Sequence, residues 1–312
     1  MYTKFLGAGC VLVLSLGAAN ALTVTAVDGN ADSGASLVNT LLGSSSGLTV
    51  TSTSFTGAAV QSGTFSDFGT TGITGLGDGI AMSSGYVAEV PNSNTDSSWD
   101  NGNLSLSSPE ALTGGSSVEP DLTTLLENAG ADLGNQDVND VNILEFTFTV
   151  DDPEQNSVSA EFVYGTDEFP DQGVTDIFAF FVDGVNYAEF SDGSLINFDE
   201  DGPNAAFYQD NTGGAFGIEW DGLTEILEVT GLLNEGLTEH TIKIAIADTF
   251  DTAFDSAVYL SALSGGTTDG GGGIDIPDDD DMVMEHIPLP AGLPLLLGGL
   301  GLLGLAQRRT SA

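Results

Sequence analysis

Two loop segments of this chain are rich in carboxylates, the side chains here best suited to bind a hard cation. One segment follows the strand-like run 158–164 and the other follows the run 241–247. Because both segments flank apolar runs, they can meet at one end of a β-sandwich, where oxygen ligands favour Ca²⁺ over zinc or copper. We therefore predict a calcium site formed by Asp167, Glu168, Asp176, Asp248, Asp251 and Asp255. The alternative is that these residues only cap loops and form turns.

Residues for covalent or acid–base catalysis are less well placed. The segment 43–47 matches G-x-S-x-G, but that nucleophile motif follows a strand and precedes a helix, and here the expected order is reversed. A Ser-His-Asp arrangement would need His240, which we interpret as a solvated residue at the start of a strand. Paired carboxylates for glycoside hydrolysis carry no weight, because 46 acidic residues form pairs by chance. We predict that the protein is not an enzyme.

Short strands must position the acidic loops. Apolar and polar residues alternate over 158–164, and Ile177–Val182 is apolar on both faces, before Asp183-Gly184 signals a hairpin into 185–190. Residues 57–85 carry many glycines, which indicate turns and bulges. The pattern predicts an all-β, jelly-roll-like β-sandwich with one or two short helices. Further strands are expected at 48–55, 141–150, 223–229, 241–247 and 257–263, and helices at 32–42 and 120–134, the second with Asp121 as N-cap.

The charge balance is extreme. The chain has 46 acidic residues against 4 Lys and Arg, a formal net charge of −42. Lys243 is the only one of these cations that lies outside the two ends of the chain. Such a surface repels nucleic acid and gains stability when salt or divalent cations screen it. Cys10, the only cysteine, lies in the N-terminal segment that we expect to be removed, so no disulfide is expected in the exported chain.

Both ends have the composition of targeting segments. Residues 1–21 have the features of a signal peptide, with Lys4, an apolar run and a small-x-small cleavage site at Ala19 and Ala21. The folded body is expected at 22–264, followed by a Gly- and Asp-rich linker at 265–286.

The last segment, 287–312, combines an apolar run with a basic end. As a helix, residues 291–306 would span about 24 Å, short of a hydrocarbon core of about 30 Å. Arg308 and Arg309 follow, which fits a cytoplasmic tail. We therefore expect a short transmembrane helix that holds the chain at the outer face of the inner membrane.

Several motifs carry a resemblance to a known family. The central ones are the runs 162–165 (FVYG), 167–170 (DEFP) and 176–181 (DIFAFF), preceded by 79–85 (GIAMSSG) and followed by Ala247-Asp248 and Asp255-Ser256-Ala257. Together they resemble the choice-of-anchor L family of bacterial surface proteins. The run 287–291 (IPLPA) resembles the VPLPA type of C-terminal sorting signal, a relative of the PEP-CTERM signals, with Ile287 in place of valine.

The resemblance implies a destination and a role. It implies processing by exosortase-type sorting machinery, followed by arrival at the cell surface or outside the cell. We predict a non-enzymatic, calcium-stabilised component of the cell envelope or extracellular matrix, acting in adhesion or biofilm and contacting extracellular polysaccharide. The alternative is a calcium-dependent carbohydrate-binding module, in which Trp99, Trp220, Tyr187 or Tyr208 stack on sugar rings. The residues of the implied sorting signal are Pro288, Leu289, Pro290, Ala291, Arg308 and Arg309.

Overall fold

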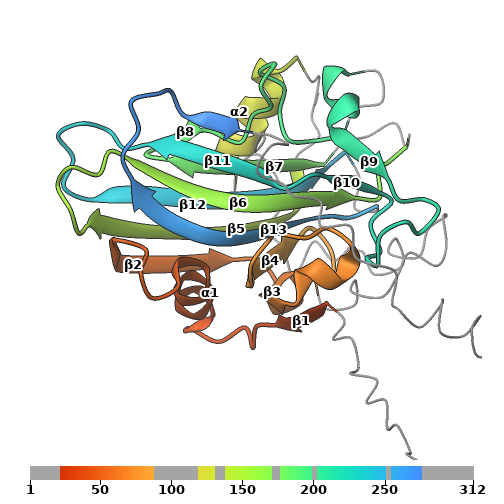
Figure 1. Ribbon diagram of the computed structural model, residues 1–312, viewed down its shortest axis with the longest axis horizontal. Helices are drawn as coiled ribbons and strands as arrows, with labels where there is room; N and C mark the ends of the chain where they lie inside the picture. Colours follow the sequence, from red (N-terminus) through yellow and green to blue (C-terminus); the bar gives the residue numbers. More distant parts are fainter. Residues whose placement is uncertain are drawn as a thin grey trace, which may run out of the picture. The chain divides into compact units, whose positions relative to one another are not determined.

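Two antiparallel β-sheets pack face to face in the computed structural model, which describes residues 22–87, 119–130, 138–170, 176–198, 202–250 and 254–275 (Figure 1). Sheet A has nine strands in the order β1-β3-β4-β13-β6-β10-β9, with β11 pairing β6 and β14 pairing β11. Sheet B has five strands in the order β2-β5-β12-β7-β8. The predicted all-β class and the sandwich are confirmed.

The strands of sheet A are mostly short, apart from its two central members. Those two are β6 (Ser157–Thr166) and β13 (Ser256–Gly266), which pair with each other over most of their length. The others are β1 (Thr23–Ala26), β3 (Ser62–Ser66), β4 (Gly79–Ser83), β9 (Tyr208–Asp210), β10 (Gly222–Thr224), β11 (Leu227–Leu232) and β14 (Gly273–Asp275).

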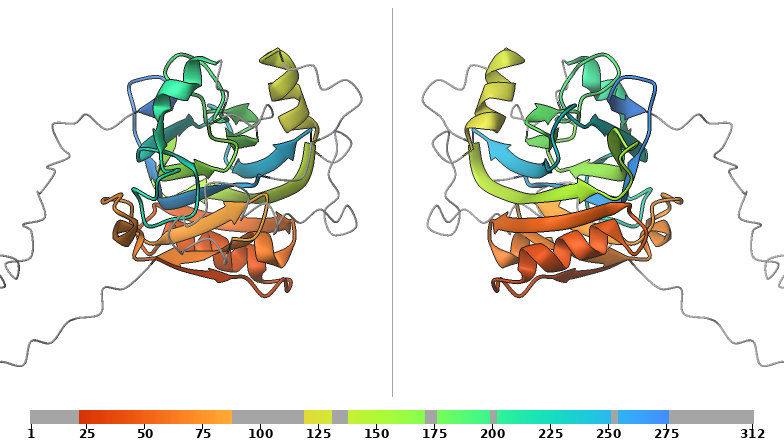
Figure 2. Two further views of the ribbon diagram at one scale, coloured as in Figure 1. Left: turned by 90° about the vertical axis from the view of Figure 1, so that its right-hand side faces the viewer. Right: turned by 90° about the vertical axis from the view of Figure 1, so that its left-hand side faces the viewer.

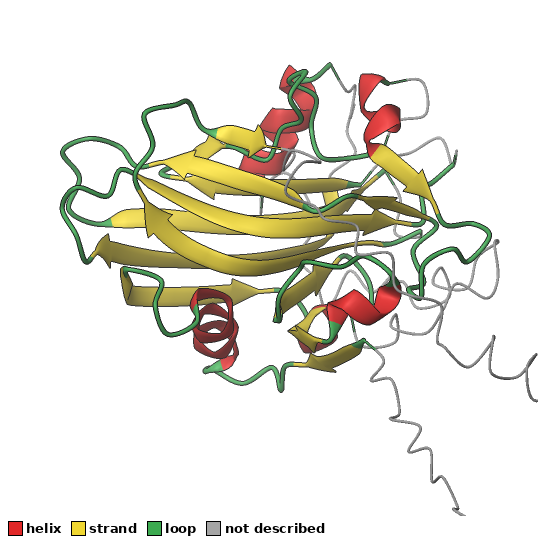
Figure 3. Ribbon diagram, in the orientation of Figure 1, coloured by secondary structure: helices red, strands yellow, loops and turns green. Residues whose placement is uncertain are grey.

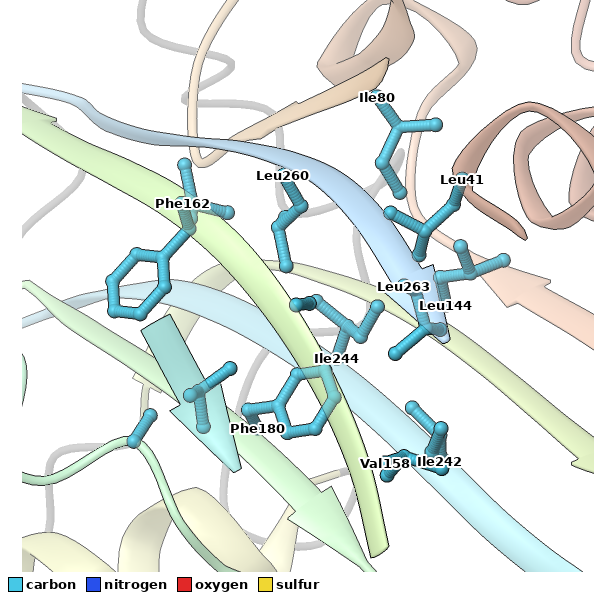
Figure 4. Packing of buried hydrophobic residues seen from close by; sticks show 14 of the residues in the cluster. Leu41, Ile80, Leu144, Val158, Phe162, Phe180, Ile242, Ile244, Leu260 and Leu263 are labelled. Atoms are coloured by element: carbon cyan, nitrogen blue, oxygen red, sulfur yellow. The ribbon is translucent and has the colours of Figure 1, made fainter. Parts of the chain in front are cut away.

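Sheet B is built around β12 (His240–Thr249), which lies between β5 (Val138–Val150) and β7 (Ile177–Val182). Strand β2 (Leu48–Thr56) forms one edge of the sheet and the two-residue β8 (Val185–Asn186) forms the other. Between the sheets, alternate side chains of each strand interlock, among them Phe162, Phe180, Ile244 and Leu260 (Figure 4). Period-two alternation therefore assigns one face of each strand to this central core.

Further elements close one edge of the sandwich and cover its outer faces (Figures 2 and 3). Helix α1 (Ser33–Leu42) inserts Leu37, Val38 and Leu41 into the central core and contacts β2, β4 and β13. Helix α2 (Pro120–Asn128) packs Leu122 and Leu126 on the outer face of sheet B. An aromatic cluster that includes Phe65, Trp220 and Tyr259 covers part of the outer face of sheet A. Three 3₁₀ turns, at Ala59–Gln61, Phe68–Thr71 and Pro203–Phe207, complete the described elements.

The structure differs from the sequence-based prediction where glycine hides strand patterns. Residues 57–85 contain β3 and β4 as well as turns, because Gly63 and Gly79 lie so close to neighbouring backbone that a side chain would collide with it. The expected strand 223–229 is two strands, β10 and β11, and the hairpin strand after Gly184 is only β8. Part of the expected linker is also a strand, since β14 pairs with β11 and buries Ile274.

The predicted second helix is confirmed, but its N-cap is Glu119 and Pro120 is the first helical residue. Proline favours that position because its missing N–H would have no partner there. The expected signal peptide, the sorting signal and the short C-terminal helix lie outside the described residues. Within the described residues, no helix is long and apolar enough to cross a membrane.

Candidate metal centre

The inward-facing rows of six strands all change from apolar to polar at the same end of the sandwich. On β12, Ile242, Ile244 and Ile246 are followed in this row by Asp248. The corresponding polar positions are Ser84 after β4, Asp140 in β5, Glu168 after β6, Asp176 before β7 and Ser256 in β13, all of them buried. Antiparallel pairing brings these ends together within each sheet, as Thr166 opposite Ser256 and Asp248 opposite Asn139 show.

Hydrogen bonds join the two sheets at this polar end. Ser256 Oγ, from sheet A, contacts Asp176 Oδ2 at 2.5 Å and Thr166 Oγ1 at 2.8 Å. Nearby, Asn142 of β5 donates through Nδ2 to the backbone carbonyls of Gln61 and Ser83. The polar end is therefore a buried region joined by hydrogen bonds, and it is not a solvated rim.

We define the carboxylate cluster as Asp140, Glu168, Asp176, Asp248 and Asp255. At its centre, Asp248 is fully buried, and neither of its carboxylate oxygens has a hydrogen-bond partner of good geometry. Burial raises the pKa of Asp248 well above its usual value, and the nearby charges of Asp176 and Asp255 raise it further, whereas Ser84 lowers it slightly. A carboxylate in this position is stable only if it binds a proton or a cation.

Asp140, a member of the cluster, and its neighbour Tyr164 share this environment. Burial raises the pKa of Asp140 to about 7, and its interaction with Asp248 partly opposes this shift. Burial also raises the pKa of Tyr164 well above its usual value, with further contributions from Asp176 and Glu168. Asp140 has a left-handed backbone with φ of 47°, as do Phe250 at 68° and Phe254 at 64° in the loop between Asp248 and Asp255. Left-handed aromatic residues are strained, and such strain is concentrated at ligand-binding loops.

Five of the six predicted ligands fall at this end of the sandwich, but they do not all point to the same place. Glu168, Asp176, Asp248 and Asp255 are buried at the cluster. Asp167 points to the opposite face of β6, because successive residues of an extended chain alternate. Its Oδ1 accepts the backbone N–H of Asp221 at 3.2 Å, and its charge contributes to the raised pKa of Tyr259, behind burial as the main cause. Asp251 lies outside the described residues.

Three residues at this end were not predicted from the sequence: Asp140, Ser84 and Gly85. Asp140 directly precedes the predicted strand 141–150, and its place beside Asp248 depends on the register of β5 opposite β12, in which the pairing shifts at this point. Gly85 has a different role, since a Cβ added there would approach Asp255 Oδ2 to 1.8 Å. Glycine at this position therefore makes the space in which the Asp255 carboxylate lies.

No group of three or more His, Cys, Asp or Glu side chains stands ready to hold a metal ion among the described residues. Residues 171–175 and 251–253, which include Asp171 and Asp251 and precede Asp176 and Phe254 in the sequence, lie outside the described residues. The charged donors of the described set are all oxygens, the ligand type that hard cations prefer.

Other candidate residues are accommodated by the fold itself. His240 is not the solvated residue that we expected: it is 5% exposed, and its Nδ1 lies 2.7 Å from Asp183 Oδ2. Trp220 is 1% exposed and donates through Nε1 to the Tyr259 hydroxyl at 3.1 Å, so it cannot stack on a sugar. Tyr208 is half-buried and donates to the Asn197 carbonyl. Tyr187 is half-buried too, and Trp99 lies outside the described residues.

The fold and the cluster define an antiparallel β-sandwich with a buried acidic end. The family model of the Choice-of-anchor L domain matches residues 25–265, from within β1 almost to the end of β13, and the chain belongs to this family. Membership indicates an exported protein anchored at the cell surface. Neither a curated protein nor a solved structure matches the chain.

Proposed function

We propose that this chain is a non-enzymatic surface protein of the cell envelope or extracellular matrix whose sandwich is stabilised by Ca²⁺ at the carboxylate cluster. The observation that carries the proposal is Asp248: a fully buried carboxylate, without a hydrogen-bond partner of good geometry, surrounded by other carboxylates. The proposed ligands are Asp176, Asp248 and Asp255, together with Asp251 from the intervening loop.

The charges of the described residues leave few alternatives to a bound cation. Lys243 is the only Lys or Arg among them, and it pairs with Glu119 and Asp121 on the outer face of sheet B. His240 is committed to Asp183. Near neutral pH the cluster must therefore hold extra protons or bind a cation from solution. Ca²⁺ accepts six to eight oxygen ligands in flexible geometry, so carboxylates together with backbone carbonyls or water can form its shell.

Calcium binding would also make the stability of the fold depend on where the protein is located. A ligand that binds only the folded state stabilises it by about 2.7 kcal/mol at a hundredfold excess over Kd. A polyanion without disulfides would be weakly stable where calcium is scarce and stable where it is abundant. This condition suits a protein that is exported before it must persist, at the surface or in a matrix rich in polysaccharide.

Thermal unfolding tests the calcium site. The full chain is melted in EDTA, in Ca²⁺ and in Mg²⁺ at fixed ionic strength, and we expect Ca²⁺ to raise Tm by several degrees beyond Mg²⁺. In Asp248→Asn the calcium gain should disappear, while stability in EDTA should be unchanged or higher because one buried charge is gone. Asp269→Asn, an exposed aspartate, is the matched control and should keep the full gain. Equal Tm in EDTA and Ca²⁺ for the unmodified chain would refute the site.

The location and role need separate tests. Deleting residues 288–312 should shift the protein between membrane and medium, and identical fractionation would contradict the proposed sorting signal. A matrix role predicts altered biofilm in a deletion strain. Specific glycan binding in calcium, lost in Tyr187→Ala or Trp99→Ala, would instead establish the carbohydrate-binding alternative.

A further inference from the structure

A pocket of about 460 Å³ lies at the end of β12 that is away from Asp248. It is lined by the loop between β5 and β6, by the loop between β11 and β12, and by His240 at the start of β12. A hydrogen bond of 2.9 Å joins the two loops, from the backbone N–H of Leu233 to the carbonyl of Asn156. Both loops can be followed in Figure 1, where β5 ends and β12 begins. The pocket is therefore built into the folded sandwich.

His240 brings a buried hydrogen-bond acceptor to this pocket. Its Nδ1 lies 2.7 Å from Asp183 Oδ2, and Asp183 also accepts the backbone N–H groups of Asn234 and Thr241. An ionised carboxylate has no proton to donate, so Nδ1 carries the proton of the neutral ring and Nε2 carries a lone pair. The side chain is only 5% exposed, and Nε2 forms no hydrogen bond with the residues that the structure describes. It therefore calls for a donor from outside the chain.

The rest of the lining combines negative charge with aliphatic surface. Glu154 and Glu235, one from each loop, are exposed carboxylates at the pocket. Leu237 is 50% exposed, more than any other large apolar side chain in the described part of the chain. The other apolar members of the lining are Val150, Pro153 and Leu233. No Lys or Arg belongs to this lining, so its charged groups favour a cation.

We propose that this pocket binds a primary ammonium group carried on an aliphatic stem. The ammonium donates an N–H to His240 Nε2 while its charge lies near Glu154 and Glu235. The stem packs on Leu237 and its apolar neighbours. An aliphatic stem fits this lining better than a sugar ring does, since no Phe, Tyr or Trp belongs to the lining for stacking.

The ligand comes from another molecule. Lys243, the only lysine of the described residues, is paired with Glu119 and Asp121 on the outer face of sheet B. The same chemistry is offered by a lysine side chain of a partner protein and by a free diamine or polyamine. The pocket does not depend on the calcium site, because the two lie at opposite ends of β12.

A metal ion is the main competitor for the lone pair of His240. Imidazole is a good ligand for zinc and copper, and a carboxylate commonly accepts the other ring N–H of such a histidine. Within the described residues, however, no three side chains are placed to hold a metal ion. An ammonium group needs only acceptors and apolar surface, which the pocket has.

Nitrogen NMR of the full chain labelled with ¹⁵N-histidine tests the proposal. The chain has only two histidines, His240 and His286, so His286→Gln assigns both imidazoles. In EDTA above neutral pH, we expect the His240 ring proton on Nδ1. Added n-butylammonium should shift the Nε2 signal to saturation, whereas 1-butanol, with the same stem and no charge, should not. A ring proton on Nε2, or an equal shift with 1-butanol, would overturn the proposal.

Variants of the lining separate the pocket from general attraction to a polyanion. Glu154→Gln/Glu235→Gln should weaken n-butylammonium binding by about fivefold, since exposed ion pairs contribute modestly. The control Glu127→Gln/Glu225→Gln removes the same charge at exposed positions outside the pocket and should leave binding unchanged. Equal weakening in both double variants would contradict a specific site.

Two further titrations identify the ligand. A shift of the His240 Nε2 signal with Zn²⁺ in the absence of EDTA, and none with n-butylammonium, would replace the ammonium by a metal ion and refute the proposal. A short peptide with one lysine is then compared with 1,4-diaminobutane, and its lysine-acetylated form is the control that lacks the charge. Tighter binding of the peptide would assign the pocket to a partner protein, and tighter binding of the diamine would assign it to free polyamines.

Discussion

Strand β12 has a buried carboxylate beside each of its ends, and the fold accommodates the two in opposite ways. At the start of the strand, Asp183 accepts the backbone N–H groups of Asn234 and Thr241, both at 2.9 Å, and contacts His240. At the other end, Asp248 has neighbours that are themselves carboxylates. The two sites are about 25 Å apart along the strand at about 3.4 Å per residue.

The difference shows which part of the fold is self-sufficient. The groups that satisfy Asp183 all come from the chain, so the loops at that end close without help from solution. The Asp248 end has oxygen donors but no matching positive charge among the described residues. Under the proposed calcium binding, stability at this end depends on what the solution provides, whereas at the Asp183 end it is fixed by the chain.

Removing the Asp183 carboxylate should give the largest loss in the free energy of unfolding. Asp183→Ala leaves His240 and two backbone N–H groups without their acceptor, and we expect a loss of about 3 kcal/mol in the free energy of unfolding. The loss should be the same in EDTA and in Ca²⁺, as measured by urea unfolding. Asp269→Ala, an exposed position, should change stability by less than about 0.5 kcal/mol. A loss seen only in Ca²⁺ would show that the two ends are coupled, and the comparison would then fail.

Much of the sandwich could be predicted from the sequence, because alternation and apolar runs directly encode strands such as β6, β7 and β12. Strands β3, β4 and β14 were missed, since Gly63, Gly79 and Gly273 carry no side chain and alternation is then invisible. The pairing of β2 with β5 and of β13 with β6 links residues far apart in the chain, which local patterns do not encode.

The candidate site was predictable in composition but not in geometry. The two acidic loops were recognisable from their composition, and the structure brings their flanking strands to one end of the sandwich. That Asp167 turns away from Glu168 follows from alternation and was open to sequence reasoning. The contribution of Asp140 needed the register of β5 opposite β12, in which Asn139 pairs with Asp248.

A third buried carboxylate, Glu119, sharpens the comparison, because it pairs with Lys243, the only Lys or Arg among the described residues. Lys243 Nζ lies 2.7 Å from Glu119 Oε1, also contacts Asp121, and lies 4.8 Å from the centre of the Phe181 ring. Burial alone would lower the pKa of Lys243, but the hydrogen bonds with Asp121 and Glu119 outweigh it and raise the pKa.

Breaking this pair should have the second-largest effect. Lys243→Met leaves the Glu119 carboxylate buried without its cation, and we expect a loss of about 2 kcal/mol, together with faster amide exchange in α2. Adding Glu119→Gln to Lys243→Met should restore more than half of the loss, because the uncompensated charge is then removed. If the two substitutions were simply additive in urea unfolding, the ion pair would not be what holds α2 on sheet B.

The smallest change in stability is expected at a pair of carboxylates that lie opposite each other but remain in contact with water. Glu161 of β6 and Glu228 of β11 are cross-strand neighbours on the outer face of sheet A. Burial raises the pKa of Glu161, and the charge of Glu228 raises it further. The folded state therefore holds the Glu161 proton more tightly than the unfolded state does, so this residue lowers stability progressively as pH rises through its folded pKa.

Replacing Glu161 by glutamine removes this loss, and the gain must depend on pH. In EDTA, Glu161→Gln should be more stable than the unmodified chain at pH 8 by only a few tenths of a kcal/mol, because solvent screens a half-exposed pair. The difference should shrink at pH 5, which still lies above the pI of about 4.1. Glu154→Gln, an exposed residue in the loop between β5 and β6, controls for the change in net charge. A gain in stability that is equal at both pH values, or shared by the control, would mean that net charge and not the pairing with Glu228 sets the effect. A pH-dependent gain confined to Glu161→Gln would show that even a half-exposed carboxylate pair destabilises this polyanionic fold.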